Sequence, residues 1–403
     1  MHNDILSGKK IILGVTGGIA AYKSGYLVRE LTKRKAEVRV VMTPPAAEFI
    51  SPLTLSTLSN YKALVNTFPS SQKDGTDVST WHIDYALWAD LMIIAPATIN
   101  TLAKIAHGFA DNALTTLASA LRSPLLIAPA ADLDMYENKF TQENIQRLES
   151  NGTFIVKAES GELASGLSGY GRMADINKII DAAEIVLSGL KKDLMGRRIL
   201  ITAGPTYEDI DPVRFIGNRS SGKMGYAIAK AAFLRGADVT LISGPTASTA
   251  YPEIKIINVR SAAEMKKSVE KELKNNDSLI MAAAVADFRP MVSKSKKIKK
   301  EDKFSEIKLT QTDDILASLK KDGKTIIGFA LETDNEKSNA IKKLKTKYLD
   351  MIVLNSVKDK KSSFEFDTNK ITVIHKSGKQ KSYPLLSKFQ AANKILSEIT
   401  GSK

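Results

Sequence analysis

The chain contains no cysteine among its 403 residues, and this absence narrows the chemistry open to it. Without thiols it forms no disulfide, zinc–thiolate site or iron–sulfur cluster, and it has no cysteine nucleophile. No apolar run reaches the roughly 18 residues that cross a bilayer, and the opening segment MHNDILSGKK lacks the apolar core of a signal peptide. We therefore expect a cytoplasmic globular protein that binds no membrane.

Aromatic side chains are also scarce, at 6% of the chain, and they are not interleaved with the basic residues. Single-stranded nucleic acids are bound by stacking their bases on aromatic rings, so we expect no nucleic-acid partner. The 43% apolar content is enough for full cores. At about 150 residues per domain, the length predicts two or three domains.

Basic side chains are concentrated in the second half. Residues 1–190 have a net charge of −2, and residues 191–403 have a net charge of +16. This asymmetry indicates two units with different partners, and a basic unit can bind nucleotides or phosphates. The alternative is that most of these lysines form an ordinary solvated surface.

Apolar runs alternate with amphipathic stretches, which is typical of a parallel sheet with crossover helices. In the first half, strands are predicted at 9–17, 36–42, 91–95 and 125–128, with helical patterns at 20–35, 86–89 and 101–121. The pattern restarts with strands at 197–203, 237–243, 277–283, 325–329 and 351–355 and a helix at 223–235. We therefore predict an α/β protein of two doubly wound domains, 1–190 and 191–403.

The loop GVTGGIAAYK, residues 14–23, lies between the first strand and its helix. Glycines there let backbone N–H groups approach a phosphate at the helix N-terminus. The second strand ends in Met42-Thr43-Pro44, without the acidic residue that binds a dinucleotide ribose. This favours a mononucleotide such as FMN in a flavodoxin-like domain, and the alternative is a tight turn with no ligand.

Other motifs follow strands at the same expected edge. They are 95–100 (APATIN) and 128–136 (APAADLDMY). A glycine-rich segment, 161–173, is expected to be a mobile flap. His82, in Trp81-His82-Ile83-Asp84, is a catalytic candidate, although a lone histidine is more often structural.

Together these residues resemble the flavin-dependent cysteine decarboxylases, and specifically the decarboxylase half of the bifunctional coenzyme A biosynthesis proteins. The resemblance implies that FMN oxidises the thiol of phosphopantothenoylcysteine, CO₂ is lost, and the enethiol is then reduced. It also implies catalytic roles for His82, Asp132 and Ser165. The implied FMN site comprises Gly17, Gly18, Ile19, Thr43, Ala95 and Thr98.

Two positions depart from this family. Its Pro-Ala-Met-Asn motif reads Pro129-Ala130-Ala131-Asp132 here, and its flap cysteine is Ser165. A serine hydroxyl cannot replace a thiol in redox or proton transfer, and the Asp132 carboxylate would repel a substrate carboxylate. Three interpretations stay open: a non-catalytic flavoprotein module, the oxidative half-reaction alone, or a different substrate with a new role for Asp132.

The second half carries a different set of motifs. Residues 211–225 (DPVRFIGNRSSGKMG) place serines, glycines and a lysine at a helix start, which predicts a polyphosphate site without Walker A spacing. Asp287 ends a central strand, where its carboxylate can bind Mg²⁺ or a ribose hydroxyl. The lysine-rich segment 294–308 is either a solvated surface or a loop that closes over phosphates.

These motifs, with AAVADFRP and GFALET, resemble phosphopantothenate–cysteine ligases over about residues 196–400. The resemblance implies that 4′-phosphopantothenate and CTP form an acyl-cytidylate, which cysteine converts to an amide. It implies that Arg214 and Asn218 handle the intermediate, that Lys297 stabilises developing charge, and that Asp287 holds Mg²⁺. The implied CTP site comprises Ser221, Gly222, Asp287, Lys297, Phe329, Lys343 and Lys347.

The resemblance also implies a homo-oligomer. Trimeric contacts of the decarboxylase half and dimeric contacts of the ligase half combine into a closed dodecamer. A dinucleotide oxidoreductase with two Rossmann units is a weaker alternative, because no GxGxxG with a downstream ribose-binding acid is present.

Overall fold

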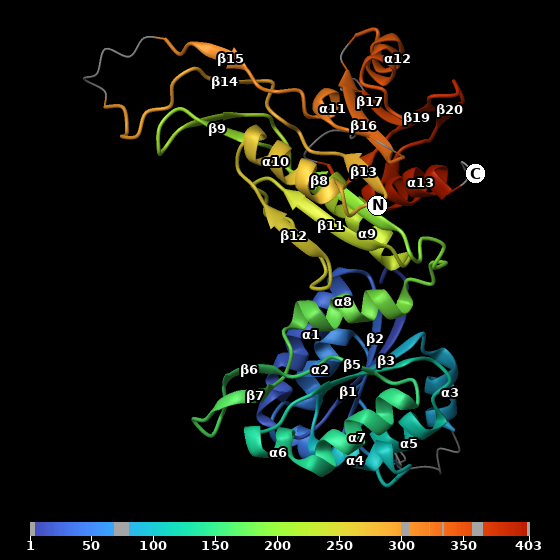
Figure 1. The fold of residues 1–403 in the computed structure, drawn as a ribbon. Helices are drawn as coiled ribbons and strands as arrows, with labels where there is room; N and C mark the ends of the chain where they lie inside the picture. Colours follow the sequence, from blue (N-terminus) through green and yellow to red (C-terminus); the bar gives the residue numbers. More distant parts are fainter. Residues whose placement is uncertain are drawn as a thin grey trace. The chain divides into compact units, whose positions relative to one another are not determined.

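The computed structural model describes residues 5–67, 80–299, 306–321, 323–332, 334–356 and 366–400. The chain divides into two compact units, one ending at Gly189 and the other starting at Leu190 (Figure 1). Each unit is built around one main sheet. No helix in the described ranges is long and apolar enough to cross a membrane.

The N-terminal unit contains a parallel sheet of five strands in the order β2-β1-β3-β4-β5. Its strands are β1 (Lys10–Val15), β2 (Glu37–Met42), β3 (Leu91–Ala97), β4 (Leu125–Pro129) and β5 (Phe154–Ile155). Because helices cover both faces, the central strand β3 is apolar and buried along its whole length. This strand order is that of flavodoxin, so the predicted fold of this unit is confirmed.

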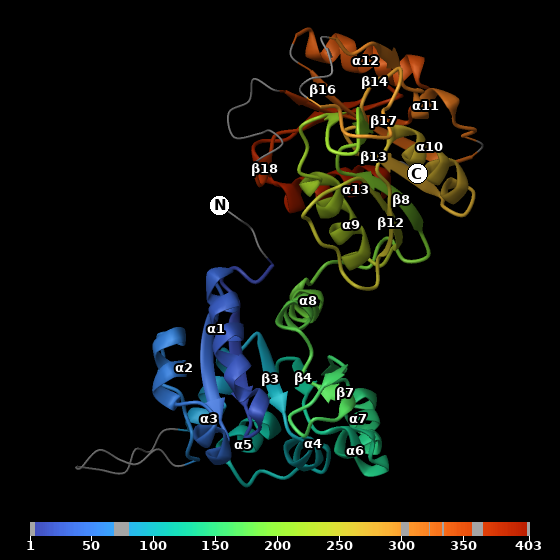
Figure 2. The ribbon, with the colours of Figure 1, turned by 90° about the vertical axis from the view of Figure 1, so that its left-hand side faces the viewer.

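Helices lie on both sides of this sheet (Figure 2). One side has α1 (Lys23–Lys33), α2 (Pro52–Ser59) and α8 (Ile176–Leu187), and the other has α3 (Trp81–Trp88), α4 (Ile99–Ala106), α5 (Ala113–Ala120) and α7 (Lys139–Ser150). Shorter elements are the 3-10 helices η1 (Ile19–Tyr22) and η2 (Pro44–Glu48), helix α6 (Leu133–Glu137), and the hairpin of β6 (Glu159–Glu162) and β7 (Ser168–Arg172).

The helical pattern predicted over 101–121 does not form one continuous helix. Helix α4 ends at Ala106, and Gly108 then turns the chain with a φ of +72°, a conformation that glycine adopts readily. Helix α5 starts separately after Asn112, whose side chain accepts from the N–H of Thr115 in a capping box.

The C-terminal unit contains an eight-stranded sheet in the order β12-β11-β8-β13-β16-β17-β19-β20. Its strands are β8 (Arg198–Ala203), β11 (Asp238–Ser243), β12 (Lys255–Asn258), β13 (Ser278–Met281), β16 (Thr325–Glu332), β17 (Met351–Ser356), β19 (Thr372–His375) and β20 (Gln380–Ser382). The first six are parallel in the Rossmann order 3-2-1-4-5-6, which confirms the predicted fold. Strands β19 and β20 add an antiparallel edge that the sequence did not predict.

Helices cover both faces of this sheet as well. Helix α9 (Lys223–Leu234) packs on β8 and β11 with α13 (Lys388–Thr400) beside it, while α10 (Ala262–Leu273), α11 (Ile315–Ser318) and α12 (Glu336–Thr346) contribute to the core of the opposite face. Small antiparallel pairs join β9 (Tyr207–Asp209) to β10 (Phe215–Gly217), β14 (Phe288–Pro290) to β15 (Leu309–Gln311), and β18 (Thr368–Asn369) to β21 (Leu386–Ser387). Strands β14 and β15 extend away from the sheet (Figure 1).

Candidate active sites

The carboxyl ends of β1, β2 and β3 meet at one edge of the N-terminal sheet. The Thr16 hydroxyl donates to the carbonyl oxygen of Pro96 at 2.8 Å and accepts from the N–H of Thr98 at 2.9 Å. The N–H of Thr43 donates to the carbonyl oxygen of Val15 at 3.0 Å. These bonds hold the loops after the three strands together, so Thr43 and Thr98 lie at the edge where doubly wound sheets bind ligands.

The glycine loop after β1 passes close to Pro45. A Cβ on Gly17 would lie 2.6 Å from the Cβ of Pro45, so only glycine fits there. Gly18 precedes η1 with no side-chain cap, and Ile19 is 63% exposed. The first N–H groups of a helix have no acceptor within it, so this turn suits a phosphate. Ala95 is different: it is fully buried in the core and supports the edge from inside.

Asp132 and Ser165 lie on neighbouring segments. Asp132 follows β4, and its Oδ1 accepts from the N–H of Leu133 at 2.8 Å, which caps α6. The β6–β7 hairpin rests on this segment, because the N–H of Ala131 donates to the carbonyl oxygen of Gly171 at 2.9 Å. Ser165 is exposed in the turn of that hairpin, where the expected flap is.

His82 lies in α3, on the face of the sheet that α5 also covers. Its ring contacts Trp81 edge-on, with ring centroids 5.8 Å apart. Among the described residues, no hydrogen bond or ring contact joins His82 to Asp132 or Ser165. The structure of this single chain therefore does not bring the three predicted catalytic residues together.

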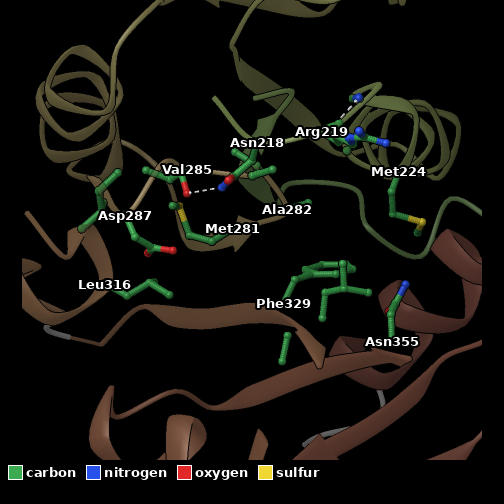
Figure 3. A pocket seen from close by; sticks show the side chains of 18 of the residues that line it. Asn218, Arg219, Met224, Met281, Ala282, Val285, Asp287, Leu316, Phe329 and Asn355 are labelled. Carbon is green, nitrogen blue, oxygen red and sulfur yellow. Dashed lines mark hydrogen bonds between the residues drawn. The ribbon is translucent and has the colours of Figure 1, made fainter. Parts of the chain in front are cut away.

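A cavity of about 560 Å³ opens at the carboxyl edge of the C-terminal sheet (Figure 3). It lies beside the ends of β8 and β13, where the strand order reverses and ligands bind in such sheets. Seven residues predicted for the ligase chemistry line it: Asn218, Ser221, Gly222, Asp287, Phe329, Lys343 and Lys347.

Two hydrogen bonds fix the wall of the cavity that follows β13. The hydroxyl of Thr206 accepts from the N–H of Ala286 at 2.9 Å, and this threonine is fully buried. The amide Nδ2 of Asn218 donates to the carbonyl oxygen of Val285 at 2.8 Å, as Figure 3 shows. Asn218 is thereby held at the cavity wall, with its side-chain oxygen available to a ligand.

Helix α9 begins at the cavity. Gly222 has a φ of +71°, which favours glycine, and the helix has no side-chain cap. A Cβ on Gly225 would lie 2.5 Å from the Cβ of Ala203, so glycine is required for α9 to pack against β8. The helix therefore starts close to the end of its strand with N–H groups available to an anion.

Lys343 and Lys347 face the cavity from α12 and the residue that follows it. Lys343 donates to the carbonyl oxygen of Phe329 at 3.1 Å, and burial lowers its pKa, with a smaller effect from the charge of Lys347. Lys347 pairs with Asp314 at 2.8 Å. Both cations are held in place before a ligand arrives, and an anionic ligand would favour the charged form of Lys343.

Asp287 has an exposed side chain at the cavity. Asp313 and Asp314 line the same cavity. No group of three or more His, Asp or Glu side chains in the described ranges could hold a metal by itself. Mg²⁺ commonly takes one or two carboxylates plus substrate phosphates, and Asp287 fits that pattern.

Arg214 and Lys297 do not line the cavity but share a second cluster. Buried Asp211 accepts from the backbone N–H of Arg214 at 2.9 Å and of Ile298 at 3.2 Å. Arg214 donates to the carbonyl oxygen of Ile298 at 3.0 Å. Lys297 is exposed next to Ile298, while residues 300–305 of the lysine-rich segment and Thr333 of GFALET lie outside the described ranges.

Comparisons with known proteins agree with this two-part architecture. The Flavoprotein family model matches residues 1–187, and the "DNA/pantothenate metabolism flavoprotein C-terminal domain" model matches residues 194–402. The Bacillus subtilis bifunctional protein CoaBC is 42% identical over 98% of this chain and 97% of its own. The chain belongs to the family of bifunctional coenzyme A biosynthesis proteins.

Two further proteins are similar to this chain. A "Cysteine/Cysteine sulfinic acid decarboxylase" of an unknown prokaryotic organism is 48% identical over 87% of this chain and 98% of its own. The crystal structure of the C-terminal domain of a CoaBC protein is 43% identical, covers 52% of this chain and 97% of its own, and has a TM-score of 0.45.

Several residues at the cavity of this family member were missed by the sequence analysis. They are Asn355, Asn369 and Lys388. Asn355 is the last residue of a predicted strand, which is a weak indication of a place at the ligand-binding edge. The sequence gave no such indication for Lys388, because this residue starts a helix that is remote in sequence from every motif.

Proposed function

We propose that the C-terminal unit joins 4′-phosphopantothenate to cysteine with CTP as co-substrate. The observation that carries the proposal is the set of residues around one cavity at the strand-order reversal: Asn218, Asp287, Phe329, Lys343 and Lys347. The name of the Bacillus subtilis relative, which matches nearly the whole chain, supports it.

The reaction has two steps. The carboxylate of phosphopantothenate attacks the α-phosphorus of CTP, the bond to the bridging oxygen breaks, and pyrophosphate leaves. The amine of cysteine then attacks the acyl carbon and CMP leaves. We assign Asn218 and Arg214 to orient the acyl group, Lys297 to offset charge during acyl transfer, and Lys343 with Lys347 to hold the nucleotide. Mg²⁺ bound at Asp287 would neutralise phosphate oxygens.

Pyrophosphate release by the purified full chain tests this assignment. We expect release from CTP and 4′-phosphopantothenate, and amide formation only when cysteine is added. Asn218→Ala should lower turnover, because it removes a side chain held at the cavity wall. Absence of release by the unmodified chain would overturn the ligase assignment.

We propose that the N-terminal unit binds FMN through the loop at Gly17 and Gly18 and the edge residues Thr43 and Thr98. The uncapped turn before η1 fits a phosphate, and the Flavoprotein model covers this unit. When bound, FMN would supply the oxidising equivalent for decarboxylation of phosphopantothenoylcysteine. The chain's own contribution is to hold the substrate beneath the β6–β7 hairpin, near Asp132 and Ser165.

A second candidate for this unit is decarboxylation of a free sulfur-containing amino acid. Phosphopantothenoylcysteine has a neutral amide where free cysteine or cysteine sulfinate has an ammonium, which the Asp132 carboxylate can pair with. Decarboxylation of the sulfinate breaks one C–C bond and adds a proton to the carbon, with no net redox change, so it needs no thiol at Ser165. The printed name of the 48% identical relative favours this candidate.

Following CO₂ from phosphopantothenoylcysteine, cysteine and cysteine sulfinate in parallel separates the two candidates. Asp132→Asn should reduce activity on a free amino acid and improve activity on the acylated substrate. Unchanged activity on phosphopantothenoylcysteine would contradict the repulsion by Asp132, and unchanged activity on the free amino acid would contradict its pairing with the ammonium.

We further propose that the protein works as a cytoplasmic homo-oligomer. Ile19, Tyr22, Tyr26 and Leu53 expose large apolar surfaces around the proposed FMN edge, with exposed fractions between 53% and 74%. Contact with another copy would cover such surface. Light scattering of the purified chain tests this, and a monomer at micromolar concentration would contradict it.

A further inference from the structure

One wall of the proposed nucleotide cavity is a loop, residues 282–287, that connects β13 to β14. Five of its six residues line the cavity, and the exception, Ala286, is buried. Because the loop lies outside the strands, its buried peptide groups need hydrogen-bond partners from elsewhere. The contacts that supply these partners therefore set the shape of the wall.

Thr206 contacts this loop without lining the cavity. It follows β8, the strand beside β13, and it is fully buried. Its hydroxyl accepts from the N–H of Ala286 at 2.9 Å, and its own N–H donates to the carbonyl oxygen of Ala284 at 3.3 Å. Ala286 is only 3% exposed, so water cannot easily replace the threonine hydroxyl as its partner.

Thr312, which follows β15, holds the next peptide group of the loop. Its hydroxyl donates to the carbonyl oxygen of Ala286 at 2.6 Å, and its N–H donates to the carbonyl oxygen of Asp287 at 2.9 Å. Thr206 and Thr312 therefore bind the peptide groups on both sides of Ala286. The backbone of Asp287 is fixed by the protein itself, which lowers the entropy cost of orienting its carboxylate towards a ligand.

The N-terminal unit has a corresponding contact. Thr16 follows β1, is fully buried, and accepts from the N–H of Thr98, which follows the neighbouring strand β3. In both units the two strands concerned are those between which the strand order reverses. Ligands bind to doubly wound sheets at this point. The same contact thus occurs at the proposed ligand-binding edge of each sheet, which favours a role in arranging that edge.

We propose that Thr206 is a positioning residue for the ligase reaction. Its hydroxyl fixes the peptide group of Ala286 and so holds Asp287 where this carboxylate serves the nucleotide and Mg²⁺. This inference deepens the proposed ligase function and rests on it. Thr206 acts through Asp287, so loss of the hydroxyl weakens CTP binding only while the Asp287 carboxylate is present.

Calorimetric titration of the full chain with CTP and Mg²⁺ tests the proposal. Thr206→Val keeps the shape of the side chain and leaves the N–H of Ala286 without its acceptor, which should weaken CTP binding about 3- to 20-fold. Thr206→Ser keeps the hydroxyl and should stay within about threefold of the unmodified chain. The matched control is Thr240→Val, which removes a buried hydroxyl from β11 of the same unit and should leave the affinity unchanged.

A double-mutant cycle separates positioning from a general structural effect. In an Asp287→Asn background, Thr206→Val should weaken CTP binding by less than about twofold, because the group that it positions has lost its charge. An equal loss in both backgrounds, or unchanged affinity of the single Thr206→Val variant, would overturn the proposal. An unmodified chain that does not bind CTP would refute the proposed ligase function instead.

Amide hydrogen exchange of the unmodified chain decides the matter if a variant does not fold or binds too weakly to measure. The N–H of Ala286 should be protected in the ligand-free protein, because Thr206 already holds it, and CTP should add little protection. Rapid exchange of this amide without CTP would overturn the positioning role.

Discussion

Glu398, near the end of α13, is expected to stabilise the C-terminal unit in a pH-dependent way. Its carboxylate is 8% exposed and accepts from the hydroxyl of Tyr383 at 2.6 Å and from Lys381 at 3.0 Å, with the ring of His375 at 3.2 Å. Burial alone would raise its pKa, but these partners lower it from 4.5 to about 2. The perturbation is Glu398→Gln, which keeps the shape and removes the charge.

The magnitude follows from the difference in pKa between the folded and unfolded chains. Each unit corresponds to about 1.4 kcal/mol, so the ionised carboxylate of Glu398 contributes up to about 3 kcal/mol at pH 7. Because folding lowers this pKa, the stabilisation is complete above 4.5 and is lost as the pH falls towards about 2. At pH 3.5 about 2 kcal/mol remains.

Urea unfolding at several pH values measures this directly. Both tryptophans, Trp81 and Trp88, lie in the N-terminal unit, so tryptophan fluorescence reports that unit and circular dichroism reports both. Glu398→Gln should lower the free energy of unfolding of the C-terminal unit and leave the fluorescence transition unchanged. Exposed Glu306→Gln is the control. A difference between wild type and variant that stays constant from pH 7 to 3.5 would refute the linkage argument.

Three other variants test the sites. Gly225→Ala should destabilise the C-terminal unit by about 1–3 kcal/mol, because the added Cβ meets Ala203, and urea unfolding measures this. Asp211→Asn should lower ligase turnover about tenfold by releasing the loop hydrogen bonds, while the affinity for CTP, measured by calorimetry, stays the same; a weakened affinity would place Asp211 in the nucleotide site. Asp132→Asn with Ser165→Cys should raise 4′-phosphopantetheine formation about 100-fold, as restored acid–base chemistry would; equal product from the unmodified chain would contradict it.

The sheets could be predicted because their strands are buried on both faces. Strand β3 is apolar at every position, so periodicity was not needed to recognise it. The helix over 101–121 was mispredicted because its composition is helical throughout except around Gly108 and Asn112. The turn at Gly108 ends the first helix and capping by Asn112 starts the second, and both effects depend on packing.

The nucleotide cavity was predictable to the extent that its residues lie near the carboxyl ends of strands. Phe329 lies in the second half of β16 and Asp287 lies in the loop after β13, and parallel strands end at one edge. Lys388 could not be found this way, because its place depends on α13 packing beside α9. Likewise, nothing in the sequence signals that Asp211 joins Arg214 to Ile298, since that contact forms only when two distant loops meet.

The position of α13 also affects how this protein is made. Helix α13 follows every other element of its unit in chain order, yet it supplies Lys388 to the cavity. During translation, which adds about 5–20 residues per second, the N-terminal unit can fold once Gly189 has left the ribosome. The proposed ligase site is completed only after α13 emerges. A nascent chain stalled before Lys388 should therefore carry a folded flavoprotein unit and an incomplete nucleotide site.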